Sequence, residues 1–305
     1  MSLVTVGTVA FDDIETPYGK VEKVIGGACT YISWAASYFT NQINLVSIVG
    51  DDFPQSEIQL LNDRGVNTDG LEVVENGKSF FWAGKYHENM ISRDTITTDL
   101  NVLADFDPVL PPTYRSPDFL MLGNLTPEVQ MKVINQLESQ PKMIALDTMN
   151  FWMDVALDSL LSVLKKVDLL SINDEEARQL SGEFSLVNAA DKILEMGPKY
   201  LIIKKGEHGA LLFGENRMFY CPAMPLALVK DPTGAGDTFA GGMLGYLTHR
   251  NEITFDILKT ALVYGSVMAS FCVEEFSLTK LKGLEPHHIT ERMEGFKALT
   301  HFEVS

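Results

Sequence analysis

Short apolar segments with the composition of β-strands alternate with helical segments along much of this chain, and this alternation limits the fold more than any other feature. Strands and helices that alternate at this spacing form βαβ units, in which helices cover both faces of a parallel sheet. The sequence therefore predicts an α/β domain of three layers around a mostly parallel sheet. The strand segments are 3–7, 43–50, 118–123, 142–147, 167–172 and 199–205, and helical spacing marks 27–39, 54–65, 127–138 and 174–182.

One region departs from the alternation. Residues 78–100 have the composition and period of strands without a helical segment, and residues 16–24 resemble them. Together they predict a small antiparallel sheet, here called the flap, formed by about 13–25 and 76–100. No repeat, low-complexity tract or linker divides the chain. We therefore expect residues 1–305 to form a single domain that carries the flap as a lid.

Glycine or a polar residue ends many of the predicted strands. In an open parallel sheet, ligands bind beyond the carboxyl ends of the strands. A cleft is therefore expected along this edge, where the sequence places Gly7, Gly50, Gly123, Asp147 and Asn173.

The segment 231–242 reads DPTGAGDTFAGG and precedes an expected helix from Asp237 to about Thr248. A glycine-rich turn before a helix offers unpaired amides and the positive end of the helix dipole, which together bind anions. A carboxylate at Asp237 would repel such an anion unless it had a chemical role. An acidic residue in a first helical turn can also simply balance the dipole, so the segment alone leaves both interpretations open.

The formal net charge of −17 argues against a nucleic-acid partner, since phosphate backbones are bound by basic surfaces. A polyphosphate would have to be held by backbone amides, a helix N-terminus, Mg²⁺ and a few cations. Three cysteines without C-x-x-C spacing predict neither a disulfide framework nor a zinc site. We expect no apolar run of membrane-spanning length and no secretory leader, and hence a cytoplasmic protein without a membrane partner.

Four motifs follow one another in a recognisable order. The pair Gly26–Gly27 precedes a helical segment, residues 173–176 (NDEE) fit N-x-x-E, and residues 204–209 (KKGEHG) fit x-x-G-x-x-G. Residues 231–242 fit D-T-x-G-A-G-D-x-F-x-x-G, with Pro232 where a threonine often stands. In these motifs and their order the chain resembles the ribokinase-like (pfkB) family of carbohydrate kinases over nearly its whole length. The resemblance implies an ATP-dependent kinase that phosphorylates a primary hydroxyl group.

The resemblance assigns the chemistry to the glycine-rich segment. Asp237 would be the general base that takes the proton of the substrate hydroxyl as the γ-phosphoryl group arrives. The amides of Gly234, Ala235 and Gly236 would stabilise the charge on the transferred group.

Two pairs of residues are implied as cation sites. Asn173 and Glu176 lie one helical turn apart and would order Mg²⁺ and its waters. The alternative for this pair is a helix N-cap followed by a solvated acid. Asp231 and Thr233 match positions where family members often bind a monovalent cation, so K⁺ is a further implied cofactor.

The segment 204–209 is implied in binding ATP. Lys204, together with Asn173, would contact the nucleotide, and Gly206 and Gly209 would let the backbone approach it. The same glycines also suit a hairpin turn between 199–204 and 210–214.

On the substrate side, residues 7–12 (GTVAFD) match the family's G-S-x-x-x-D. The resemblance makes Asp12 the acceptor for sugar hydroxyls, with Asp13 as its rival. It also implies that Gly26 and Gly27 bind substrate, because glycine lets a hydroxyl group approach the backbone closely.

The chain departs from the sugar kinases at several substrate positions. Tyr31 stands where ribose-phosphorylating members carry asparagine, and Asn150 lies in DTMNF (147–151), which lacks the arginine of D-x-N-x-R. The flap adds aromatic residues, of which Trp82 would either contact the substrate or only pack. These departures make a nucleoside as credible an acceptor as a free sugar, while Lys85 and Arg93 in the flap leave a phosphorylated acceptor open.

Two other functions compete with a kinase. A ligand sensor on the same fold is one, because fold alone does not establish activity, although a sensor would not need both phosphate-site motifs intact. A nicotinamide-dependent dehydrogenase is disfavoured, since the opening strand–helix junction lacks G-x-G-x-x-G. The exposed edges of the flap lead us to expect a homodimer formed through it.

Overall fold

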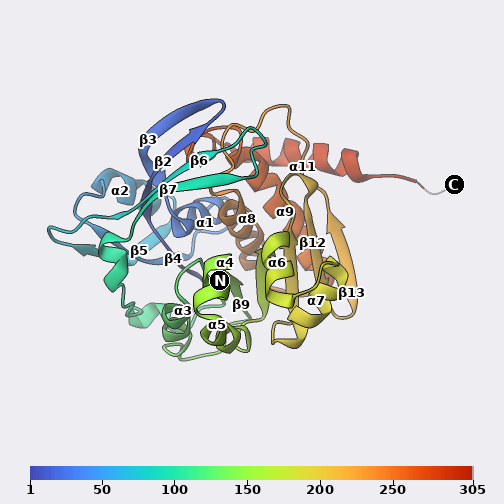
Figure 1. Ribbon diagram of the computed structural model, residues 1–305, viewed down its shortest axis with the longest axis horizontal. Coiled ribbons are helices and arrows are strands. Elements are labelled where there is room, and N and C mark those ends of the chain that lie inside the picture. The colour runs from blue at the N-terminus through green and yellow to red at the C-terminus, as the bar shows by residue number, and fades with distance from the viewer. Residues whose placement is uncertain (304–305) are drawn as a thin grey trace.

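The computed structural model describes residues 1–303 and contains two sheets, shown with the surrounding helices in Figure 1. In the nine-stranded sheet, neighbouring strands are parallel from β5 to β11 and antiparallel from β11 to β13. The mostly parallel sheet predicted from the sequence is thereby confirmed. The strand order is β13 (Arg217–Cys221), β12 (Ala210–Gly214), β11 (Tyr200–Lys204), β10 (Leu169–Asn173), β9 (Met143–Asp147), β8 (Phe119–Leu122), β1 (Leu3–Val6), β4 (Ile43–Gly50) and β5 (Val66–Val74).

Successive residues of the central strands pack on opposite faces of this sheet. Leu3 and Phe119 belong to one hydrophobic cluster, whereas Val4 and Leu120 belong to another. Strands buried on both faces need no polar alternation, which explains their continuous apolar sequences. One face is covered by α1 (Ala28–Ala36), α2 (Gln55–Asp63), α8 (Ala235–Arg250), α9 (Phe255–Cys272), α10 (Thr279–Lys282) and α11 (Pro286–Thr300), and the other by α3 (Pro127–Ile134), α4 (Asn150–Val155), α5 (Leu157–Leu164), α6 (Asp174–Ser181) and α7 (Leu186–Glu195).

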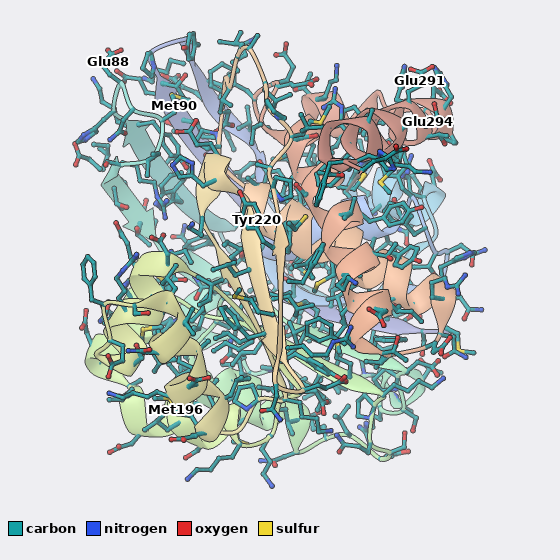
Figure 2. All side chains as sticks on the ribbon, turned by 90° about the vertical axis from the view of Figure 1, so that its right-hand side faces the viewer. Glu88, Met90, Met196, Tyr220, Glu291 and Glu294 are labelled. Atoms are coloured by element: carbon teal, nitrogen blue, oxygen red, sulfur yellow. The ribbon has the colours of Figure 1, made fainter. Side chains whose placement is uncertain are left out.

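The β13 edge of the sheet lies between these two helical layers. Figure 2 looks at this edge and shows Tyr220 on β13, with Glu291 and Glu294 of α11 on one side and Met196, which follows α7, on the other. The predicted three-layer arrangement is therefore confirmed.

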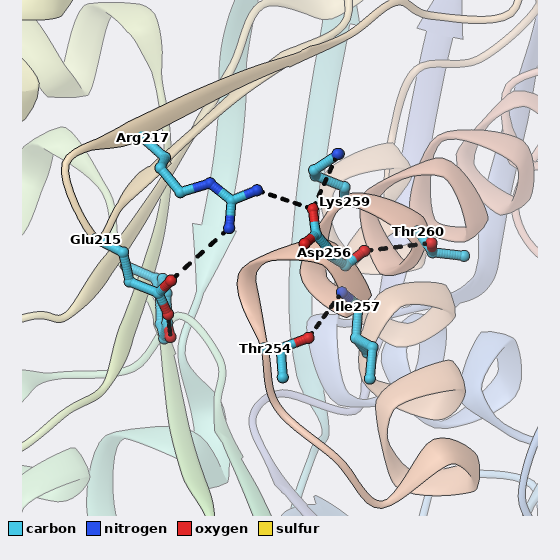
Figure 3. A network of polar contacts seen from close by, with 8 residues as sticks. Glu215, Arg217, Thr254, Asp256, Ile257, Lys259 and Thr260 are labelled. Atoms are coloured by element: carbon cyan, nitrogen blue, oxygen red, sulfur yellow. Dashed lines mark hydrogen bonds and ion pairs between the residues drawn. The ribbon is translucent and has the colours of Figure 1, made fainter.

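Polar contacts attach the β12–β13 hairpin to the start of α9, as Figure 3 shows. Asp256 pairs with Arg217 at 2.9 Å and with Lys259 at 3.0 Å. The Thr254 hydroxyl caps the same helix by accepting the N–H of Ile257 at 3.2 Å. Because the charged groups are exposed, these pairs orient the hairpin and contribute little stability.

The flap consists of four strands in the order β3 (Gly19–Gly26), β2 (Ala10–Thr16), β6 (Phe80–Tyr86) and β7 (Arg93–Asp99). Both hairpins are antiparallel, but β2 and β6 pair in parallel, so the expectation of a wholly antiparallel flap was wrong for this junction. The reason is that each hairpin begins directly after a parallel strand of the large sheet, β2 after β1 and β6 after β5. The flap therefore stands over the carboxyl edge of that sheet.

Helix α9 contains an apolar run that the sequence analysis did not recognise. It has 18 residues with a mean hydropathy of 1.3, so the expectation that no run reaches membrane-spanning length was wrong for this segment. In the structure 61% of it is buried, and Leu258, Leu262 and Phe271 lie in the core beside α8 and α11. Its apolar composition is that of a core helix.

Glycines let α8 lie directly against α1. A Cβ atom at Gly241 would stand 2.3 Å from the carbonyl oxygen of Ile32, and one at Gly245 would stand 2.8 Å from the Cα of Ala36. Such distances leave no room for a methyl group, so the two helices must touch through backbone.

Gly241→Ala is expected to lower the free energy of unfolding by about 2 kcal/mol, because the added methyl group forces α8 away from α1. Gly295→Ala, in α11, is the matched control: its Cβ would meet only Met224 at 3.5 Å. That change should be neutral or stabilising by up to about 1 kcal/mol. Denaturant unfolding of both variants measures the difference, and equal stabilities would contradict the close α1–α8 contact.

Candidate active site

The glycine-rich turn and the start of α8 form the centre of the candidate site. Gly234 is the N-cap of α8 with φ 75°, and a Cβ there would lie 2.5 Å from the ring of Tyr31. Only glycine satisfies both the left-handed backbone and this contact. Thus Tyr31, predicted to bind substrate, is buried beneath the turn, and its hydroxyl has no hydrogen-bond partner within residues 1–303.

The amides of the turn are not equivalent. The N–H of Ala235 donates to the carbonyl of Pro232 at 3.2 Å, so it closes the turn and is not free for a ligand. Within residues 1–303, no backbone carbonyl accepts the N–H groups of Gly234 and Gly236. Of the three amides predicted from the sequence, two are therefore available to an anion at the helix N-terminus.

Asp237 lies in the first turn of α8, in an acidic environment. The pKa of its carboxyl group is raised to about 7, mainly by burial and also by the charge of Asp147, while Lys204 acts in the opposite direction. A carboxyl group with such a pKa is suited to exchange a proton near neutral pH.

Lys204 is the cation at the centre of this environment. Its ammonium group lies 3.3 Å from a carboxylate oxygen of Asp147 and the same distance from the place of a Cβ at Gly236. Burial lowers its pKa, but the charges of Asp147, Glu176 and Asp237 outweigh burial and raise it. The sequence places Asp147 at a strand end and at the start of DTMNF (147–151), but no motif indicates this ion pair.

Asn173 and Glu176 form a capping box at the start of α6. The Asn173 side chain accepts the N–H of Glu176 at 2.8 Å, and the Glu176 carboxylate accepts the N–H of Asn173 at 2.7 Å. The N-cap alternative is thus confirmed, but the acid is buried rather than solvated. The pKa of Glu176 is raised to about 7, mainly by burial, with Lys204 acting in the opposite direction.

Asp12, on β2 of the flap, is a buried carboxylate that accepts no hydrogen bond from residues 1–303. Its pKa is raised to about 8, mainly by burial and in smaller part by the charges of Asp231, Asp237 and Asp13. Gly26, on the neighbouring strand, makes room for it: a Cβ there would stand 1.9 Å from an Asp12 oxygen. Its rival Asp13 accepts the N–H of Lys23 at an exposed position.

Asp231 and Thr233 fix the turn to its surroundings. Both Asp231 oxygens accept backbone N–H groups, from Thr233 at 2.9 Å and from Ser277 at 3.2 Å. The Thr233 hydroxyl donates to the hydroxyl of Tyr86 at 3.1 Å. This bond connects the flap directly to the turn, a role for Tyr86 that no sequence motif indicated.

The other predicted substrate residues are placed differently. Gly27 faces the protein itself, since a Cβ there would meet the carbonyl oxygen of Thr8 at 2.5 Å. Trp82 pairs with Asp12 across β2 and β6, and its ring covers Gly84. The Asn150 side chain donates to Gln179 of α6 at the surface, so it is not brought to Asp12.

The nucleotide-side glycines lie in the turn between β11 and β12, which confirms the predicted hairpin. A Cβ at Gly209 would meet the carbonyl oxygen of Cys221 at 2.1 Å, so that glycine serves packing. Gly206, with φ 54°, has open space where its side chain would be.

The chain is similar to several known kinases. A cytidine kinase from Thermococcus kodakarensis is 28% identical over 254 residues, which cover 81% of this chain and 88% of that relative. The structure of a nucleoside kinase from Burkholderia thailandensis in complex with inosine has a TM-score of 0.78 at 17% identity, covering 97% of this chain and 99% of that one. A proposed ribokinase II from E. coli, in complex with ATP and Mg²⁺, has a TM-score of 0.79 at 19% identity, covering 96% and 99% of the two chains. The two structural likenesses confirm the ribokinase-like fold.

The family model of the pfkB family carbohydrate kinases matches residues 2–282. That range contains the flap, the glycine-rich turn, the capping box and the carboxylates described above. The chain therefore belongs to the pfkB family of carbohydrate kinases.

Proposed function

We propose that this kinase transfers the γ-phosphoryl group of ATP to the ribose 5′-hydroxyl of a nucleoside. The observation that carries the proposal is a pair of carboxylates, the buried Asp12 on the flap and the partly buried Asp237 at the start of α8, which lie close enough for the charge of Asp237 to raise the pKa of Asp12. The similarity to a cytidine kinase over most of both chains favours a nucleoside over a free sugar.

Asp12 is suited to hold the ribose. A buried carboxylate without a protein partner gains most from two hydroxyl donors, because charged acceptors form stronger hydrogen bonds. Trp82, beside it on the same face of the flap, offers an aromatic surface for the sugar or the base. Tyr31 supports the turn from below and leaves its hydroxyl for a polar group of the substrate or a water molecule.

Asp237 would act as the general base. The 5′-oxygen attacks the γ-phosphorus, its proton passes to the Asp237 carboxylate, and the bond to the β–γ bridging oxygen breaks with its electron pair leaving on ADP. The free N–H groups of Gly234 and Gly236 would stabilise the charge on the transferred group. Ala235 acts through the turn that its N–H closes.

The nucleotide would lie toward the β10–β11 side. Open space at Gly206 gives it room beside the hairpin, and Lys204 with Asn173 would face its phosphates. Mg²⁺ commonly binds through one or two carboxylates together with substrate phosphates. Glu176 fits this role, because a cation would relieve the cost of ionising its buried carboxyl group. When bound, Mg²⁺ neutralises phosphate charge.

Two features implied by the family stay predictions. K⁺ beside Asp231 and Thr233 would have to share Asp231 oxygens that already accept backbone N–H groups. A homodimer through the flap would cover the exposed Ile96 on β7 and the neighbouring Ile91. Light scattering would measure the mass, and a monomer at all concentrations would exclude the dimer.

An acceptor screen tests the function. ATP consumption with Mg²⁺ is expected for cytidine, adenosine, inosine or guanosine at a kcat/KM at least about tenfold above that for ribose or fructose, because the aromatic flap adds contacts to a base. Asp237→Asn should lower turnover about a thousandfold and leave ATP affinity unchanged. Silence across the panel with ATP binding intact would contradict the proposal and favour the sensor.

Asp12→Asn should raise the nucleoside KM about a hundredfold, equivalent to about 3 kcal/mol, because the charged acceptor is lost. Asp13→Asn is the matched control, since Asp13 is the next residue on β2 and points to the exposed side. It should change the KM less than about twofold. Equal effects of the two changes would remove Asp12 from the ribose site.

The pH dependence of kcat/KM should reflect the ionisation of the Asp237 carboxyl group. Its carboxylate accepts a proton only when ionised, so kcat/KM should rise as the pH rises through about 7. Asp147→Asn removes a charge that raises this pKa and frees Lys204 to lower it, so the acid limb should move to lower pH. Asp158→Asn, an exposed change of equal charge, should leave the limb in place. A limb unmoved by Asp147→Asn would mean that another group titrates.

A further inference from the structure

One face of the flap is turned toward the glycine-rich turn. The hydroxyl of Tyr86, on β6, accepts a hydrogen bond from Thr233 in the turn. Trp82 lies at the fourth position before Tyr86 on the same strand, so the two side chains share a face. In an antiparallel pair, residues directly opposite each other share a face. Arg93, the first residue of β7, is opposite Tyr86 and therefore lies on this face as well.

Arg93 is a cation without a protein anion. Its guanidinium group lies 5.8 Å from the ring centre of Trp82, and no carboxylate of residues 1–303 is within ion-pair distance of it. Lys85, on the opposite face of the same hairpin, instead pairs with Glu15 at 2.7 Å. Burial raises the pKa of Tyr86 and of Glu176, and the positive charge of Arg93 opposes both shifts, so Arg93 acts on the phosphate side of the site as well.

The site is otherwise poor in positive charge. Its carboxylates come from Asp12, Asp147, Glu176, Asp231 and Asp237, whereas the ammonium group of Lys204 is already paired with Asp147. A polyphosphate brought into these surroundings needs a further cation, and a guanidinium group binds phosphate oxygens in a bidentate manner.

We propose that Arg93 is a catalytic residue, supplied by the flap, whose guanidinium group contacts the phosphoryl group during its transfer. Its guanidinium group lies 5.8 Å from the ring centre of Trp82, and Trp82 pairs with Asp12 across β2 and β6. The assignment rests on the proposed kinase function. It makes the flap part of the phosphate site in addition to covering the substrate.

Arg93→Ala should lower kcat at least about a hundredfold, with the nucleoside KM within about twofold, because arginines that stabilise a transferring phosphoryl group act mainly in the transition state. Arg93→Lys should restore only part of the rate, since it keeps the charge but not the bidentate geometry. Guanidine added to Arg93→Ala should raise the rate in a saturable manner, an effect that a structural role would not produce.

Lys85→Ala is the matched control, because it removes an equal charge from the other face of the same hairpin, and its kcat should stay within about twofold of the wild type. An Arg93→Ala enzyme with near-normal kcat, or one impaired only in nucleoside KM, would overturn the assignment. If the wild type turned over no acceptor, the proposed function would fail. Calorimetry would then decide on Arg93 separately: ATP affinity about tenfold lower in Arg93→Ala supports the phosphate contact, and equal affinities refute it.

Discussion

The partly buried ammonium group of Lys204 is the charge on which the rest of the site depends. Burial alone would favour the neutral amine, yet the carboxylates of Asp147, Glu176 and Asp237 keep its pKa raised. Each of those carboxylates would in turn be costlier to bury without a cation beside it. Because Asp147, Asn173 and Lys204 end neighbouring parallel strands, the register of the sheet sets their spacing. In a chain with a net charge of −17, three acidic groups thus surround one cation, while the N–H groups of Gly234 and Gly236 have no backbone acceptor within residues 1–303.

Features that depend on local pattern could be predicted from the sequence. The apolar runs at 43–50 and 142–147 became central strands because a strand buried on both faces needs no other signal. The turn at 231–236 could be predicted because its glycines and the following helix lie within one short segment of the sequence. Asp12 and Gly26 were named through motif resemblance, and the structure adds the reason they occur together, which is that one occupies the space the other leaves.

Features that depend on contacts between distant segments could not be predicted. The parallel pairing of β2 with β6 joins two hairpins that are far apart in the sequence, and neither sequence contains a pattern that indicates the other as its partner. The Asp147–Lys204 ion pair joins β9 to β11 across the intervening strand β10. The N–H of Ala235 donates to Pro232 within the turn, and the sequence Gly234–Gly236 does not specify that hydrogen bond. Strand β5 was overlooked because it is a largely exposed edge strand without an apolar run. Asn150 matched a motif position, but a surface contact with Gln179 holds its side chain.

The glycine contact between α1 and α8 also governs when this molecule can become active during its synthesis. Tyr31 on α1 lies under Gly234, so the turn takes its shape only after the C-terminal third of the chain has docked on the N-terminal part. Contacts of such large sequence separation form late, because the loop between them must close first. A ribosome-bound fragment that ends before α8 contains Asp12 and Lys204 but neither the free amides nor Asp237. Phosphoryl transfer by the proposed mechanism therefore requires that α8 and the turn before it have been synthesised and have docked on α1.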